Sequence, residues 1–143
     1  MPIRKAEAEW NGKITDGKGH MTFGSGAFDG AYSFQSRMQD GPGTNPEELL
    51  GAAHAGCFSM ALSAQLSQAG LTPTRIHTTA GVHLDKVGEG WAISAVDLVT
   101  EGAVPGLDQQ QFQQHAETAK KNCPVSKLFA GAEITLKATL AGS

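Results

Sequence analysis

Apolar and polar residues alternate with a period of two along residues 75–84, which favours a β-strand with one buried face. Its apolar positions hold isoleucine, alanine, valine and leucine, with threonine among them, and the positions between hold polar residues or glycine. A turn at residues 88–90 leads into residues 91–101, which predict the return strand of a long hairpin. The same alternation over residues 132–140 predicts a last strand.

Shorter alternating segments fill the first third of the chain. Residues 6–10 predict a strand, Asn11 and Gly12 supply the residues of a tight hairpin turn, and residues 13–15 predict the returning strand. Residues 32–38 alternate as well, so we expect a strand there, with Arg37 on its polar face. This part of the chain is therefore expected to be β-structure.

A long helix is expected between these two groups of strands, from Pro46 to Gln68. Asn45 can cap it, Pro46 suits the first helical position, and Glu48 completes a capping-box pattern. Gly70 marks its end, because glycine readily adopts the left-handed conformation that follows many helices.

The middle of this helix, residues 49–62, is apolar on nearly every side, so we expect it to be central and buried. A second helix should open at Asp108 and end at Cys123, where a short third helix begins. The order of strands, a long helix, strands, two helices and a last strand predicts an α+β fold with antiparallel sheets packed on a long central buried helix, in one domain over residues 1–143. A helix without a polar face is difficult to bury in one small domain, so we predict a homodimer in which two such helices pack together.

Charge and composition exclude some classes of partner. The chain has 143 residues and a formal net charge of -3, and its lysines and arginines form no basic stripe, so we expect no nucleic-acid partner. No apolar segment follows Arg4 and Lys5, so we expect no signal peptide, and residues 49–62 are too few to span a bilayer. We therefore expect a cytoplasmic protein without a membrane partner, in which thiols stay reduced.

The two cysteines are the strongest candidates for chemically reactive residues. Cys57 lies in the apolar part of the long helix, and Cys123 stands at the expected start of the short helix. Unpaired backbone N–H groups and the helix dipole favour a thiolate at a helix N-terminus, which suits a resolving thiol. A buried thiol with such a second thiol is the minimum for a redox cycle in which one sulfur is oxidised and the other captures it.

A thiol buried among apolar residues stays protonated, so a reactive Cys57 needs a nearby cation. Arg37 is the candidate, because only a short loop separates it from the long helix. A guanidinium about 4 Å from the sulfur contributes about 4 kcal/mol at an effective dielectric near 20, or roughly 3 pK units before desolvation is subtracted. It would also stabilise charge on a departing oxygen, which favours a substrate with a weak bond, such as a hydroperoxide.

Glu47 is the candidate for holding Arg37 in place through a bidentate ion pair. Ten residues of straight helix, however, separate Glu47 from Cys57 by about 15 Å along the axis. Either the helix begins later than Pro46, or Arg37 and Glu47 reach Cys57 of the partner subunit. We favour the second, which makes the site a property of the dimer.

Two other interpretations remain open. The apolar dimer interface could hold a hydrophobic ligand while both cysteines stay inert. Alternatively, histidines and cysteines could form a mixed metal site in a non-enzymatic dimer. Its members would be His54, Cys57, His115 and Cys123. Their spacing matches none of the usual paired zinc-ligand patterns, so we assign no metal ligands.

Two runs of sequence resemble the OsmC/Ohr family, and in particular its osmotically inducible protein C (OsmC) branch. The first run, from Thr44 to Leu62, reads TNPEELLGAAHAGCFSMAL, and the second, from Asn122 to Lys127, reads NCPVSK. The organic hydroperoxide resistance (Ohr) branch usually carries a tyrosine where Val125 stands, so the second run favours the OsmC branch.

The resemblance implies an OsmC-like intertwined homodimer with two sites at its interface. It implies a thiol-dependent peroxidase that reduces organic hydroperoxides. The family's peroxidatic and resolving thiols fall on Cys57 and Cys123, and its arginine and glutamate fall on Arg37 and Glu47.

The implied reaction begins when the Cys57 thiolate attacks the peroxide, releases an alcohol and becomes a sulfenic acid. Cys123 then condenses with it to a disulfide, which an external dithiol reduces. The resemblance implies a lipoyl-type dithiol, and it implies no metal and no bound cofactor. The apolar surroundings of Cys57 suit an alkyl or lipid hydroperoxide better than hydrogen peroxide.

Overall fold

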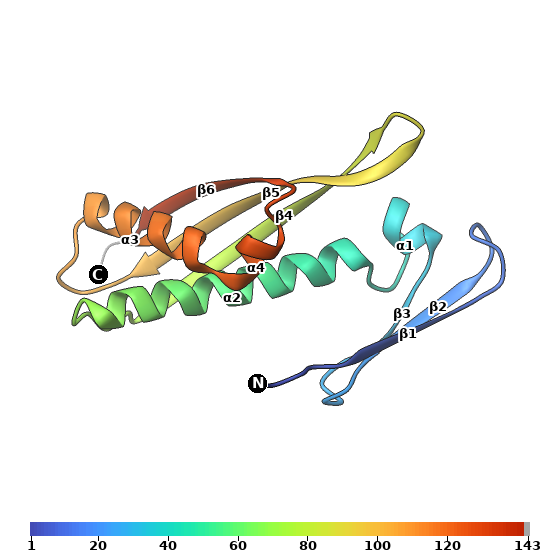
Figure 1. Cartoon of the computed structure of the whole chain (residues 1–143), viewed down its shortest axis with the longest axis horizontal. Helices are drawn as coiled ribbons and strands as arrows, with labels where there is room; N and C mark the ends of the chain where they lie inside the picture. The colour runs from blue at the N-terminus through green and yellow to red at the C-terminus, as the bar shows by residue number, and fades with distance from the viewer. Residues whose placement is uncertain (142–143) are drawn as a thin grey trace. The chain divides into compact units, whose positions relative to one another are not determined.

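The structure is a computed structural model that describes residues 1–141. The chain divides into two compact units, Met1–Leu49 and a second that begins at Leu50. Along the chain follow three strands, a short helix, a long helix, a long hairpin, two helices and a last strand (Figure 1). The predicted α+β class is confirmed. One domain over residues 1–143 stays a prediction, and its last two residues lie outside the described part of the chain.

The first unit contains a three-stranded antiparallel sheet in the order β1-β2-β3, followed by a short helix. Its elements are β1 (Ala6–Asn11), β2 (Lys18–Phe23), β3 (Asp29–Tyr32) and α1 (Phe34–Met38). On the middle strand, Gly19 lies between Trp10 and Tyr32 of the outer strands. A Cβ on Gly19 would lie 2.5 Å from the Tyr32 ring, so glycine allows both rings to pack across this position.

The predicted return strand at residues 13–15 is wrong. The returning strand begins only at Lys18, because the Gly17 N–H donates to the Lys13 carbonyl at 2.7 Å and closes a longer loop. Asn11 ends β1 and pairs with Lys18, so the loop begins at Gly12 and no two-residue hairpin turn forms.

The predicted strand over residues 32–38 is also wrong beyond Tyr32. Ser33 caps α1: its Oγ accepts from the Ser36 N–H at 3.1 Å, while the Ser36 Oγ accepts from the Ser33 N–H at 2.8 Å. This reciprocal cap favours a helix over an alternating strand. Arg37 therefore lies in the last turn of a helix.

The long helix α2 runs from Pro46 to Gln68, as predicted. Asn45 caps it, because its Oδ1 accepts a hydrogen bond from the Glu48 N–H at 2.8 Å. The Glu48 carboxylate accepts from the Thr44 hydroxyl at 2.7 Å, so only the first half of the predicted capping box is present.

The C-terminal end of α2 is closed by the predicted glycine. Gly70 has a φ of +79°, its N–H donates to the Ser67 carbonyl, and the Leu71 N–H donates to the Leu66 carbonyl. These two bonds form a Schellman motif, which satisfies carbonyls that the helix leaves free.

The second unit contains a sheet in the order β4-β5-β6. Its strands are β4 (Arg75–Val87), β5 (Gly90–Ala103) and β6 (Glu133–Leu140). β4 and β5 form the predicted antiparallel hairpin, but β6 pairs with β5 in parallel, so the prediction of purely antiparallel sheets is wrong here. The chain between β5 and β6 passes through two helices, which return it to the start of β5, as a parallel pair requires.

The core of the second unit lies between this sheet, α2 and α3 (Gln109–Asn122); the short helix α4 (Pro124–Leu128) follows α3. More buried and more exposed residues alternate over residues 75–84 of β4, over 96–102 of β5 and along β6, as the pattern predicts. The buried apolar residues are Phe58, Leu62, Leu66, Val96, Leu98, Val104, Phe112, Ala116, Ala119, Cys123 and Ala138. Gly102 of β5 allows the Phe112 ring to pack on the strand, since a Cβ there would lie 2.6 Å from a ring carbon.

Within a single chain only one face of α2 is buried, so the predicted burial of this helix on every side is not observed in the single chain. The buried face contains Gly51, His54, Phe58, Leu62 and Leu66. The exposed residues include Ala52, Ala53, Gly56, Met60 and Ala64, and 76% of the Met60 surface is accessible. By length and composition alone α2 could cross a membrane, but its buried face carries a histidine and packs on the core.

Candidate active site

The two cysteines lie side by side in the second unit. Cys57 comes from the middle of α2, and Cys123 caps the N-terminus of α4. Both are free thiols, and the Cys123 thiol donates to the Cys57 sulfur across a Sγ–Sγ distance of 3.0 Å. A disulfide has an S–S length of about 2.05 Å, so about 1 Å of movement would bring the two sulfurs to bonding distance.

The surroundings within this unit oppose ionisation of Cys57. Burial raises the pKa of the Cys57 thiol, and so does its contact with Cys123, whereas a hydrogen bond from the Val125 backbone lowers it. The causes that raise the pKa are the stronger ones. The expectation that Cys57 needs a cation in order to react therefore holds for this unit taken by itself.

A second pair of side chains joins α2 to α4 next to the cysteines. The His54 Nε2 lies 2.7 Å from the Ser126 Oγ, and both residues are buried. Burial lowers the pKa of His54, so its imidazole is neutral at neutral pH. Sequence reasoning considered His54 only as a metal ligand and missed Ser126. The available signal was its position three residues after Cys123, one helical turn away.

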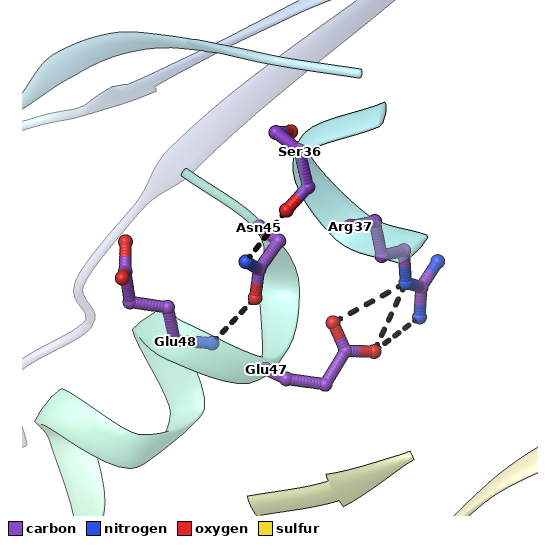
Figure 2. A network of polar contacts seen from close by, with 5 residues as sticks. All are labelled: Ser36, Arg37, Asn45, Glu47 and Glu48. Carbon is purple, nitrogen blue, oxygen red and sulfur yellow. Dashed lines mark hydrogen bonds and ion pairs between the residues drawn. The ribbon is translucent and has the colours of Figure 1, made fainter. Parts of the chain in front are cut away.

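Arg37 and Glu47 form the predicted bidentate ion pair in the first unit. The Arg37 Nε lies 3.0 Å and 3.2 Å from the two Glu47 carboxylate oxygens, and Nη2 lies 2.7 Å from Oε1. Figure 2 shows the remaining guanidinium nitrogen directed away from the carboxylate. The Glu47 side chain is 10% exposed and the Arg37 side chain 41%, so the carboxylate is shielded while the guanidinium remains accessible.

The surrounding loop fixes this ion pair. The Asn45 side chain, which caps α2 at Glu48, also donates through Nδ2 to the Ser36 carbonyl at 3.0 Å (Figure 2). One asparagine thus connects α1, which carries Arg37, to the first turn of α2, which carries Glu47.

The four predicted site residues therefore form two pairs, Cys57 with Cys123 and Arg37 with Glu47. Glu47 and Cys57 are ten residues apart on the continuous helix α2, which corresponds to about 15 Å of rise. Because α2 begins at Pro46, the alternative of a later helix start is wrong.

A metal centre receives no support from the described residues. Within residues 1–141, no group of three or more His, Cys, Asp or Glu side chains is placed to hold a metal ion. His54, one of the four ligands considered, is instead paired with Ser126.

Comparison with known proteins identifies a matching family and similar proteins. The model of the OsmC-like protein family matches residues 39–138. Peroxiredoxin OsmC of Escherichia coli is 52% identical over 134 residues, which are 93% of each chain. The organic hydroperoxide resistance protein of Xanthomonas axonopodis pv. citri is 35% identical over 71% of this chain and 69% of its own.

A solved structure gives the same fold. The organic hydroperoxide resistance protein OhrB of Bacillus subtilis superposes with a TM-score of 0.73 at 27% identity, over 96% of this chain and 98% of its own. These comparisons confirm the predicted OsmC-like fold and the prediction of a cysteine-based peroxidase. The chain belongs to the OsmC-like protein family.

Proposed function

We propose that this protein reduces organic hydroperoxides to alcohols, with Cys57 as the peroxidatic thiol and Cys123 as the resolving thiol. The observation that carries the proposal is the 3.0 Å distance between the two free sulfurs. The names of the similar proteins, a peroxiredoxin and organic hydroperoxide resistance proteins, support the same reaction.

The two oxidation steps use only these two thiols and the peroxide. The Cys57 thiolate attacks one peroxide oxygen, the O–O bond breaks, and the alcohol leaves after taking a proton. Cys57 is then a sulfenic acid. The Cys123 sulfur attacks it, the S–O bond breaks, and the oxygen leaves as water with the proton of the Cys123 thiol. The product is a Cys57–Cys123 disulfide, and an external dithiol, of the lipoyl type, reduces it back to two thiols.

Arg37 supplies the cation that Cys57 lacks within its own unit. Its exposed guanidinium would stabilise both the Cys57 thiolate and the charge that develops on the leaving oxygen. Glu47 holds the guanidinium through two nitrogens, which leaves the third nitrogen to face the substrate. Because α2 separates Glu47 from Cys57, we assign Arg37 and Glu47 to the Cys57 site of the partner subunit.

The exposed face of α2 supports a homodimer. Ala53, Gly56, Met60 and Ala64 recur at three- and four-residue spacing, so they form one apolar stripe along the helix. All but Met60 are small, and nothing lies within 4 Å of the position that a Cβ on Gly56 would take. A second α2 can therefore approach closely along this stripe. We propose a cytoplasmic dimer, since reduced thiols persist in that compartment.

Peroxidase assays test this function. We expect the reduced protein to consume cumene hydroperoxide in the presence of a dithiol, and to consume hydrogen peroxide more slowly, because the surroundings of Cys57 are apolar. The Cys57→Ser variant is the control and should show only background consumption. Equal background rates in both proteins would contradict the peroxidase function and favour a binding protein with inert cysteines.

A further inference from the structure

We propose that His54 and Ser126 are positioning residues for the second step of the cycle, in which Cys123 attacks the oxidised Cys57. This inference rests on the proposed function. It concerns how Cys123 is held 3.0 Å from Cys57 when the two residues come from separate helices.

Two residue pairs, His54 with Ser126 and Cys57 with Cys123, connect α2 to α4 and its N-terminal cap. His54 lies three residues before Cys57 on α2, and Ser126 lies three residues after Cys123 on α4. Residues three apart share one face of a helix. The bond between His54 and Ser126 and the contact between the two sulfurs are therefore neighbouring links between the same helix faces.

The short helix α4 packs on the core through the partly buried Val125, and its one side-chain hydrogen bond within residues 1–141 is the bond between Ser126 and His54. It spans five residues, and Ser126 is its one buried residue. The cap residue Cys123 makes no side-chain capping bond to it. The His54 ring also meets the Phe129 ring edge-on, with centroids 5.3 Å apart, directly after the helix. A single buried imidazole therefore contacts α4 at its buried hydroxyl and just beyond its C-terminal end.

The polar character of this contact requires an explanation beyond packing. His54 is fully buried, and its Nδ1 has no hydrogen-bond partner within residues 1–141. A buried polar atom without a partner destabilises the fold, and an apolar pair of similar size would avoid this cost. A hydrogen bond differs from apolar packing in its direction, so it fixes the rotation of α4 as well as its distance from α2.

Disulfide formation, the second step of the cycle, needs this control of the position and rotation of α4. The Cys123 sulfur must approach the Cys57 sulfur opposite the departing oxygen, and small misplacements in such a reaction cost large factors in rate. The first step needs only Cys57, its cation and the peroxide. Loss of the His54–Ser126 bond should therefore slow disulfide formation and leave sulfenic acid formation nearly unchanged.

The two steps can be measured separately with Ser126→Ala, which removes the hydroxyl, and Ser126→Thr, which retains it. Stopped-flow mixing of reduced protein with cumene hydroperoxide gives the rate of the first step, and rapid acid quenching followed by mass spectrometry gives the rate of disulfide formation. We expect Ser126→Ala to slow disulfide formation by about tenfold, to change the first step less than about twofold, and to accumulate sulfenic acid that dimedone traps. Ser126→Thr should restore at least half of the lost rate.

A double variant, His54→Phe with Ser126→Ala, separates positioning from stability. It replaces both polar partners with apolar groups, so it should unfold at nearly the same urea concentration as the wild-type protein. We still expect it to form the disulfide slowly. A wild-type rate of disulfide formation in either the single or the double variant would overturn the inference. The absence of any disulfide in the wild-type protein would instead overturn the proposed function.

Discussion

The Sγ atoms of Cys57 and Cys123 lie 3.0 Å apart, although 66 positions separate these residues in the sequence. The long helix α2 places the partly buried Cys57 against the core, and the junction of α3 and α4 places Cys123 in the core. Neither cysteine needs a large rearrangement to reach its partner. The structure thus combines, in one compact unit, the two thiols that a peroxide-driven disulfide cycle requires.

Removal of the Arg37 guanidinium should make Cys57 less acidic. Burial raises the pKa of Cys57, and the variant Arg37→Met removes the cation proposed to oppose this effect, so the pKa of Cys57 should rise further. Glu47→Gln should raise it less, because the cation remains but loses its charged anchor. The rate of alkylation by iodoacetamide, measured against pH, reports this pKa.

Arg75→Gln is the matched control for this experiment. Arg75 forms an ion pair with Glu101 at 3.0 Å, and both side chains are about half exposed. Its removal changes the net charge by the same amount, so the Cys57 pKa should stay at the wild-type value. An Arg37→Met protein with an unchanged alkylation profile contradicts the assignment of Arg37 as the cation.

Mixed dimers test whether Arg37 acts across the subunit interface. Cys57→Ser and Arg37→Met homodimers should both be inactive. When the two chains are unfolded together and refolded at equal concentration, half of the dimers are mixed. One of the two sites in each mixed dimer then combines an intact Cys57 with an intact Arg37 from the partner subunit.

We therefore expect roughly a quarter of the wild-type activity after mixing. If Arg37 serves the cysteine of its own chain, no site in a mixed dimer is intact, and the activity stays at the background of the parent variants. Wild-type protein taken through the same refolding gives the reference activity.

Acidification should destabilise the fold through His54. Burial lowers the pKa of His54 below its ordinary value of 6.5, so the unfolded chain binds more protons than the folded protein as the pH falls through this value. The free energy of unfolding should therefore keep its full value above about pH 6.5 and decrease at lower pH. Urea unfolding at several pH values measures this, and a His54→Phe protein should show a weaker decrease.

His83 gives an internal comparison by NMR. A hydrogen bond to Asp97 at 2.5 Å raises the pKa of His83, which lies on the exposed face of β4. The two imidazoles should therefore titrate on opposite sides of the ordinary value, His83 above it and His54 below it. Titration of His54 at or above 6.5 would be inconsistent with its burial.

The packing of Phe112 on β5 should make Gly102 sensitive to substitution. Gly102→Ala places a methyl group 2.6 Å from a carbon of the buried Phe112 ring, which should destabilise the protein by about 1–3 kcal/mol. Gly81→Ala on β4 is the control, because its Cβ would meet nothing closer than 3.9 Å. Urea midpoints compare the two, and equal values would argue against the tight contact.

The sequence predicted which candidate residues pair better than it predicted the elements that carry them. Cys57 and Cys123 were predicted from the reactivity of thiols in an apolar helix and at a helix start, Arg37 as the cation that Cys57 needs, and Glu47 as the anchor of Arg37; the structure brings these residues together in two pairs. Ser126 was missed because its one signal in the sequence, a position three residues after Cys123, does not reveal its contact with His54, which lies 72 positions away in the sequence.

The errors in the fold have similar causes. Alternation shows which face of a strand is buried but says nothing about strand direction, so the parallel pairing of β6 could not be deduced from it. At residues 32–38 the alternation was real, but the reciprocal cap between Ser33 and Ser36 competes with it locally and starts α1. The ends of α2 were predictable because Asn45 and Gly70 make local hydrogen bonds that need no distant partner.

The most direct test of the account is the fate of the two thiols after a single oxidation. Reduced protein is mixed with one equivalent of cumene hydroperoxide per chain, free thiols are alkylated, and the digested protein is analysed by mass spectrometry. We predict the loss of both thiols and a disulfide-linked peptide pair containing Cys57 and Cys123, with a mass decrease of about 2 Da per chain. Full alkylation of both cysteines, or an oxidised Cys57 beside a Cys123 that stays alkylatable, would contradict the account.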